Sequence, residues 1–210
     1  MRRDRAISED VGRGRDVRLL TVTAPRRIVI KPYSARWPGE FARVEAALHG
    51  ALGDIVERID HIGSTSVPGL AAKDIIDVQI SVPDLGDPRL IPAFERLGAE
   101  STDITSDHVP PGDQSTPSAW EKRYFRPPPS WRPTHLHVRE TGRANTRYAL
   151  LFRDYLRHST AAAASYAQIK VALSQLHPND VDAYYAVKDP VCDLIMDAAE
   201  RWAHDAGWTP

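Results

Sequence analysis

The sequence predicts an α+β fold in a single domain, on the basis of its length and of where strand and helix patterns occur. Segments with strand patterns all lie before residue 139, whereas apolar residues recur at helical spacing from Asn145 onward. Strands followed by helices are typical of α+β proteins. A chain of 210 residues can enclose one sizeable core, and a second full domain would be crowded.

Residues 1–26 are charged, rich in Arg and show no clear periodicity, so we expect a flexible tail there and the domain at residues 27–208. A short β-branched run at residues 28–30 begins the domain. The segment from Trp37 predicts a helix that ends at Gly53. Its apolar residues recur at helical spacing: Phe41, Val44, Leu48 and Leu52.

Two strands, at residues 55–62 and 75–82, flank a turn rich in Gly, Ser and Pro at residues 63–69. Alternate side chains of a strand point to opposite faces, so the second strand has one aliphatic face and one polar face. The aliphatic face carries Ile76, Val78, Ile80 and Val82, and the polar face carries Asp77, Gln79 and Ser81.

The remaining elements follow from periodicity and from the distribution of proline. Apolar spacing predicts a helix at residues 90–97. Clustered prolines at residues 102–133 predict a long loop region with a strand at 122–125, and alternation predicts another strand at 135–138. Three helical stretches are then expected, around residues 148–155, 166–173 and 191–202.

Composition excludes several classes of protein. The net charge of -1 removes the electrostatic case for nucleic acid or an anionic membrane surface, although small anionic ligands stay compatible with it. No segment approaches the roughly 18 apolar residues of a membrane span, and the start of the chain has no signal-peptide pattern. The single cysteine, Cys192, cannot form an internal disulfide. We therefore expect a cytoplasmic protein without a membrane partner.

The polar residues around the second strand are the first candidates for chemistry. The turn that contains Gly63, Ser64, Thr65 and Ser66 could surround a phosphate with backbone N–H groups and hydroxyls, although such turns are also ordinary connectors. Asp77 lies in mid-strand, where a buried carboxylate needs a metal or a cationic partner.

Two histidines form a second candidate group. His135 and His137 are two residues apart on a strand, so their imidazoles share a face at roughly 7 Å spacing. They could bind a metal, carry a proton or hold a phosphate. The alternative is that both are hydrogen-bonded histidines of a partly polar core.

Basic residues supply the remaining anion-binding capacity. Arginine suits bidentate contacts with phosphate, and lysine suits charge neutralisation. A solvated surface position is the alternative for each of them, and Arg153 could instead form a helix ion pair with Asp154. The candidates are Lys73, Arg123, Arg153, Lys170 and Lys188.

A turn Gly63-Ser64 followed by a strand with Asp77 and Val78 resembles the signature of the nucleotidyltransferase superfamily. Gln79 stands where that signature has a second carboxylate. A finer resemblance, over residues 28–199, is to the GrpB family. It rests on Pro32-Tyr33 with Trp37, HIGSTSVPGLAAK at 61–73, IIDV at 75–78, KRYF at 122–125, HLHV at 135–138, FRDYLR at 152–157, Tyr166, Lys170 and Lys188. The chain departs from the family pattern at Asp74, where proline is usual, and at Ser159-Thr160, where His-Pro often occurs.

The resemblance implies a nucleotidyltransferase-like mixed β-sheet with packed helices and a C-terminal helical segment. The resemblance to nucleotidyltransferases implies a transferase that binds ATP or another nucleotide with Mg²⁺ and passes a nucleotidyl or phosphoryl group to a small-molecule acceptor, whereas the GrpB family name by itself implies no settled activity. The expected metal ligands are Asp77 and Gln79, and the expected catalytic residues are Asp77, His135 and His137. Phosphate contacts are expected from Gly63, Ser64, Thr65, Ser66, Lys73, Arg123, Lys170 and Lys188. The alternative is a non-catalytic nucleotide-binding or phosphometabolite-binding module, because Gln79 replaces a carboxylate.

Overall fold

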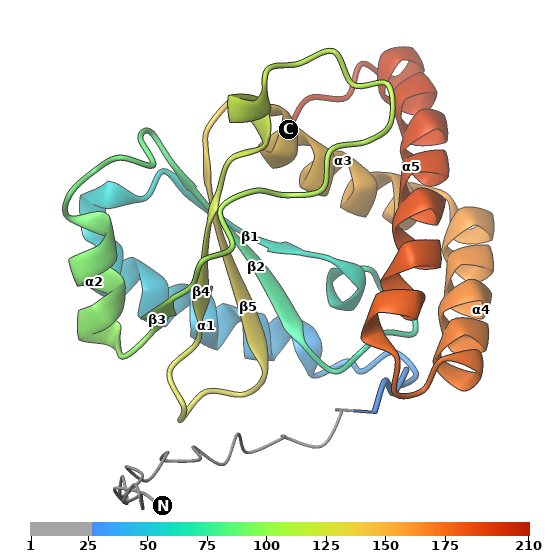
Figure 1. Ribbon diagram of the computed structural model, residues 1–210, viewed down its shortest axis with the longest axis horizontal. Helices are drawn as coiled ribbons and strands as arrows, with labels where there is room; N and C mark the ends of the chain where they lie inside the picture. The colour runs from blue at the N-terminus through green and yellow to red at the C-terminus, as the bar shows by residue number, and fades with distance from the viewer. Residues whose placement is uncertain (1–26) are drawn as a thin grey trace, which may run out of the picture.

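A computed structural model describes residues 27–210, and within them the chain forms a mixed five-stranded sheet with helices on both faces (Figure 1). The expected tail at residues 1–26 lies outside the described residues. The strand order is β1-β2-β5-β4-β3, with β2 and β5 parallel and the other neighbours antiparallel. The strands are β1 (Arg58–Ile62), β2 (Ile76–Val82), β3 (Glu100–Ser101), β4 (Arg123–Arg126) and β5 (Thr134–Glu140).

Helices α1 (Trp37–Leu52) and α2 (Leu90–Leu97) pack on one face of the sheet, over the aliphatic side of β2. Removal of this aliphatic side from water is the main favourable contribution of this core to the free energy of folding. Helices α3 (Ala144–His158), α4 (Thr160–Leu176) and α5 (Val181–Ala206) form the layer on the other face. The polar side of β2 therefore faces this second layer of helices.

The predicted α+β class is confirmed, and so are the helices at α1 and α2 and the strand at β2. These elements have strong local periodicity, and a helix can end at Gly53 because glycine readily adopts its positive φ of 54°. The run at residues 28–30 is not a strand, although the adjacent Lys31 forms an isolated bridge with Ala72. Strand β3 was not predicted, because two residues carry no detectable alternation.

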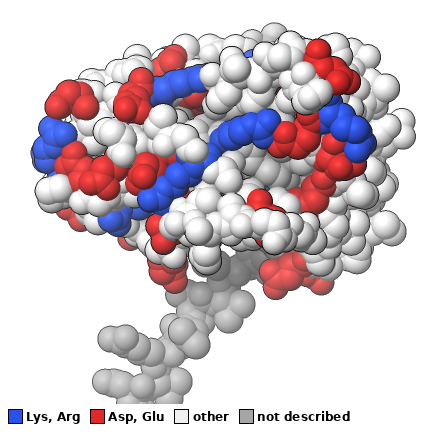
Figure 2. Space-filling model, turned by 90° about the horizontal axis from the view of Figure 1, so that it is seen from above, with Lys and Arg blue, Asp and Glu red and all other residues white. Residues whose placement is uncertain are grey.

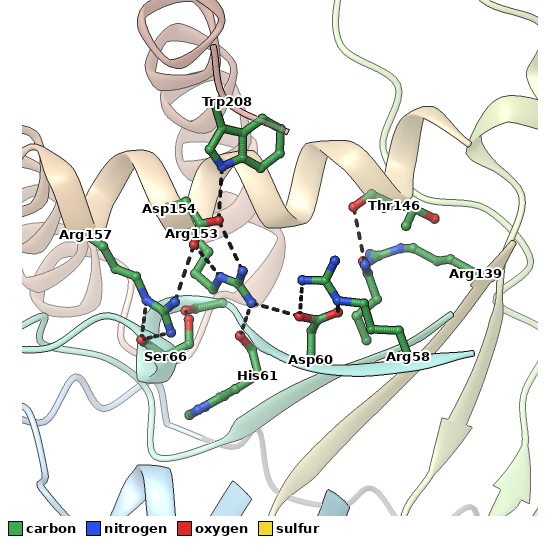
Figure 3. A network of polar contacts seen from close by, with 12 residues as sticks. Arg58, Asp60, His61, Ser66, Arg139, Thr146, Arg153, Asp154, Arg157 and Trp208 are labelled. Atoms are coloured by element: carbon green, nitrogen blue, oxygen red, sulfur yellow. Dashed lines mark hydrogen bonds and ion pairs between the residues drawn. The ribbon is translucent and has the colours of Figure 1, made fainter. Parts of the chain in front are cut away.

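Arginines of α3 fix the second layer to the sheet (Figure 3). Nη1 of Arg153 donates to Oδ1 of Asp60 and to the carbonyl of His61, each at 3.2 Å, and its Nε donates to Asp154 at 2.7 Å. The guanidinium of Arg157 donates to the carbonyl of Ser66 at 2.9 and 3.1 Å. Arg153 is therefore a structural residue that ties α3 to β1.

The surface in Figure 2 carries charged side chains of both signs. Basic and acidic side chains lie next to one another on the face in Figure 2. None of the helices within residues 27–210 is long and apolar enough to cross a membrane.

Candidate functional site

A cavity of about 310 Å³ lies between the sheet and helices α3 to α5. Ligand pockets start near this size, so the space suits a small molecule. It brings together most of the residues predicted from sequence: Gly63, Ser64, Thr65, Lys73, Asp77, His135, His137, Lys170 and Lys188.

Asp77 approaches the turn after β1 because residue 63 has no side chain. Gly63 has φ 67°, and a Cβ atom there would overlap the carboxylate of Asp77. Positive φ and the absence of Cβ both favour glycine at this position. The polar face of β2 and the turn are thus in direct contact.

The two histidines lie beside Asp77 because β5 pairs with β2 in parallel. The register places His135 opposite Asp77 and His137 opposite Gln79. Nδ1 of His135 lies 2.8 Å from Oδ1 of Asp77, and Nε2 of His137 lies 4.0 Å from the same oxygen. Burial lowers the pKa of His137 to about 4, so its imidazole is neutral at neutral pH.

Lys170 of α4 also lines the cavity and contacts the turn. It is 2% exposed, and its Nζ donates to Oγ of Ser64 at 2.8 Å and to the carbonyl of Ala71 at 2.6 Å. Burial, together with the neighbouring Lys188, lowers the pKa of Lys170 to about 7. An anion that enters the cavity would relieve this cost by pairing with the ammonium group.

Tyrosines of α5 complete the cationic end of the cavity and were not predicted from sequence. Nζ of Lys73 donates to the hydroxyl of Tyr185 at 2.8 Å. Tyr184 is fully buried, and its hydroxyl has no hydrogen-bond partner within residues 27–210. A buried hydroxyl without a partner is costly, so it marks a position for a polar ligand atom. The only sequence signal was a Tyr-Tyr pair at a helix start.

The loop before β4 contributes Asp107, another residue that sequence reasoning missed. Its carboxylate accepts hydrogen bonds from Lys122 at 2.6 Å, from Arg139 at 2.8 and 3.0 Å, and from Asn145 at 3.1 Å. Burial opposes ionisation of Asp107, but the charges of Arg139 and Lys122 outweigh it and lower its pKa below the ordinary value. Asp107 fastens this loop to β5 and α3.

Three predicted residues are engaged elsewhere. Gln79 is fully buried, and its Oε1 accepts from Arg139 at 2.6 Å while its Nε2 donates to the carbonyl of Thr146 at 3.3 Å, so its amide is occupied by protein partners. Arg123 lines a separate surface pocket, where its Nε donates to the carbonyl of Leu85 at 2.7 Å. Ser66 is buried and donates to the carbonyl of Gly63 at 2.6 Å.

Asp74, the carboxylate nearest to Asp77 in sequence, does not reach the cavity. Its Oδ1 accepts from Trp37 at 2.9 Å and from Arg132 at 2.5 Å, and its Oδ2 accepts from Lys31 at 2.9 Å. Asp74 therefore does not supply the second carboxylate that is missing at position 79.

The fold and site define an α+β protein with a small cavity that is lined by a carboxylate–histidine cluster and a buried lysine. The chain belongs to the GrpB family. The model of this family, described as "GrpB protein", matches residues 27–198. The crystal structure of the conserved protein GrpB from Enterococcus faecalis has a TM-score of 0.68 and 31% identity, and the match covers 83% of this chain and 99% of that one.

Curated relatives carry two kinds of name. A dephospho-CoA kinase of Mycolicibacterium paratuberculosis is 36% identical over 205 residues, which cover 89% of this chain and 49% of that protein. The UPF0157 protein PA4798 of Pseudomonas aeruginosa is 36% identical over 177 residues, covering 82% of this chain and 68% of that protein. The chain thus spans about half the length of the kinase it matches.

Proposed function

We propose that the chain binds a nucleotide or a similar small phosphorylated molecule in the cavity and transfers a nucleotidyl or phosphoryl group from it to a small-molecule acceptor. The observation that carries this proposal is Lys170, a buried cation bonded to Ser64 at the turn beside Asp77. A buried lysine with a lowered pKa is expensive to maintain, and a bound phosphate would stabilise it.

The rest of the cavity supports the same chemistry. Lys73 and the hydroxyl of Tyr184, which has no hydrogen-bond partner within residues 27–210, lie on its cationic side, while Asp77 and its histidines provide a second polar centre. In phosphoryl and nucleotidyl transfer the protein contributes mainly positioning and charge neutralisation. The kinase name of one group of relatives is compatible with a transferase, although it describes proteins about twice as long.

A non-catalytic binding module is the second candidate, and Gln79 favours it. Both polar atoms of its amide are held by Arg139 and Thr146, so the polar face of β2 presents one carboxylate to the cavity. The transferase and the binding module would bind the same ligand, and only the transferase would convert it to product.

Calorimetric titration of the metal-free protein with ATP, ADP, AMP and tripolyphosphate, in the presence of a chelator, tests the binding step. We expect Lys170→Met to weaken binding about tenfold or more, because a charge-assisted hydrogen bond is lost. Lys31→Met is the matched control, since Lys31 is exposed and pairs with Asp74 outside the cavity. Equal binding by wild type and Lys170→Met, or no binding of any of these ligands, would contradict the proposal.

Turnover distinguishes the two candidates. In nucleotidyl transfer an acceptor atom bonds to the α-phosphorus while the bond to pyrophosphate breaks, whereas in phosphoryl transfer from ATP it bonds to the γ-phosphorus and ADP leaves. Release of pyrophosphate or ADP in the presence of candidate acceptors, and its loss in Lys170→Met, supports the enzyme. ATP that binds and stays intact with every acceptor supports the binding module.

A further inference from the structure

The cluster of Asp77, His135 and His137 has the composition of a transition-metal site. One ligand atom from each residue lies within 4.8 Å of the other two. Magnesium, which the fold resemblance implies, prefers oxygen ligands in octahedral geometry, and two imidazoles do not suit it. Imidazole suits Zn, Cu, Fe and Ni, and two histidines with one carboxylate are a recurrent set for such ions.

We infer that Asp77, His135 and His137 bind one divalent transition-metal ion, in the Zn²⁺, Fe²⁺ or Co²⁺ class, and that magnesium does not compete effectively for this site. The inference goes beyond the proposed function, because it concerns the protein without any phosphorylated ligand.

The distances within the cluster fit a shared ion after small side-chain movements. Tetrahedral zinc–ligand bonds of about 2.0–2.2 Å place neighbouring ligand atoms about 3.3–3.6 Å apart. The observed separations bracket this range, with 2.8 Å from Asp77 to His135 and 4.0 Å from Asp77 to His137. The three side chains are 17–35% exposed, which leaves access from the cavity.

Tyr124 and Lys122 lie next to the two imidazoles of the cluster. The ring of Tyr124 packs against both histidines, at centroid distances of 5.7 Å to His135 and 5.2 Å to His137. Nζ of Lys122 lies 3.5 Å from Nδ1 of His137 and is also paired with Asp107. Packing against Tyr124 limits rotation of both imidazoles, so less conformational freedom is lost when an ion binds.

The number of ligands is consistent with a cluster that opens into the cavity. Three protein ligands leave at least one position of a tetrahedral ion for water or another ligand. Catalytic zinc sites have this arrangement, whereas structural sites are closed by four protein ligands.

A cobalt titration tests the inference, because Co²⁺ with four or five nitrogen and oxygen ligands absorbs visible light much more strongly than the hydrated ion. The chelator-treated chain without a histidine tag is titrated with Co²⁺, and Zn²⁺ or excess Mg²⁺ is then added. We expect one equivalent of Co²⁺ to bind, Zn²⁺ to displace it and Mg²⁺ to leave the spectrum unchanged. Displacement of the cobalt by the excess Mg²⁺, or no bound cobalt, would overturn the inference.

Variants assign the ligands. His135→Ala, His137→Ala and Asp77→Asn should each lower Co²⁺ affinity by about 100-fold or more, since even outer-shell changes cost about 10–100-fold. His108→Ala is the matched control, because His108 lines the same cavity but pairs with Asp193. Circular dichroism shows whether each variant is folded. Unchanged affinity in folded His135→Ala and His137→Ala would overturn the site, whereas failure to bind ATP would affect only the proposed function.

Discussion

Oδ2 of Asp77 lies in the space that a Cβ atom would fill at Gly63. This contact joins the carboxylate of β2 to the turn after β1, so the acidic and the hydroxyl-bearing parts of the site have a fixed relative position. The turn is also fastened from its other side, where Arg157 binds the carbonyl of Ser66 (Figure 3).

The first prediction concerns Gly63→Ala. A methyl group at a positive φ costs about 1–2 kcal/mol, and the overlap with Asp77 adds to it, so we expect a loss of about 2 kcal/mol or more in the free energy of unfolding. Denaturant unfolding measures this change. The control is Gly112→Ala, where φ is 83° but nothing lies within 4 Å of the added Cβ. A similar loss in both variants would show that the contact with Asp77 is unimportant.

The second prediction concerns the pH dependence of anion binding. Burial lowers the pKa of Lys170 to about 7, so the ammonium form that an anion needs decreases as the pH rises above 7. Affinity for ATP should therefore be highest below pH 7 and fall above it, by up to about tenfold per pH unit. The other titratable groups that influence Lys170 are Lys188, Cys192, Asp77 and Lys73.

Calorimetry between about pH 7.5 and 9.5 checks this dependence, because the phosphate groups are already ionised above a pKa of about 6. Lys170→Met should bind more weakly and lose most of the pH dependence. An identical slope in wild type and variant would assign the titration to another group.

A third prediction concerns Gln79→Glu, the change that would restore the missing carboxylate. Gln79 points to Arg139 and Thr146, so the new carboxylate should pair with Arg139 and Mg²⁺ affinity should stay unchanged. Calorimetric titration with Mg²⁺ tests this expectation. Tighter Mg²⁺ binding in the variant would instead support a conventional carboxylate pair on β2.

The fourth prediction concerns Asp107→Ala. The change leaves the buried cations of Lys122 and Arg139 without their carboxylate partner, at a cost of about 3–5 kcal/mol in the free energy of unfolding. Asp113→Ala, on the same loop, should cost far less because Asp113 is exposed and bonds Ser115 and Trp120.

Acid titration adds an independent check on Asp107. The pKa of Asp107 is lowered in the folded protein. Its contribution to the free energy of unfolding is therefore fully present above the unfolded-state pKa of about 3.9 and is lost as the pH falls through the folded-state pKa. Asp107→Ala should lack this part of the acid-induced loss of stability. A variant with the wild-type acid profile would show that Asp107 does not anchor the loop.

The sequence by itself determined the elements with strong local periodicity and the polar face of β2. Side chains of a strand alternate, so Asp77 had to lie opposite the aliphatic residues that pack under α1 and α2. The spacing of His135 and His137 likewise required a shared face. Family motifs added Lys170, whose helical pattern alone gave no reason to expect a buried cation.

Only the tertiary structure decided which of these residues meet. Parallel pairing of β2 with β5 depends on contacts between segments far apart in the chain, and it places His135 beside Asp77. The same long-range packing directs Gln79 to Arg139 and Arg123 to a separate pocket, although both have suitable chemistry. Asp107 gave no local signal and Tyr184 gave only a Tyr-Tyr pair at a helix start, because their roles arise from burial against strands and helices that periodicity cannot position.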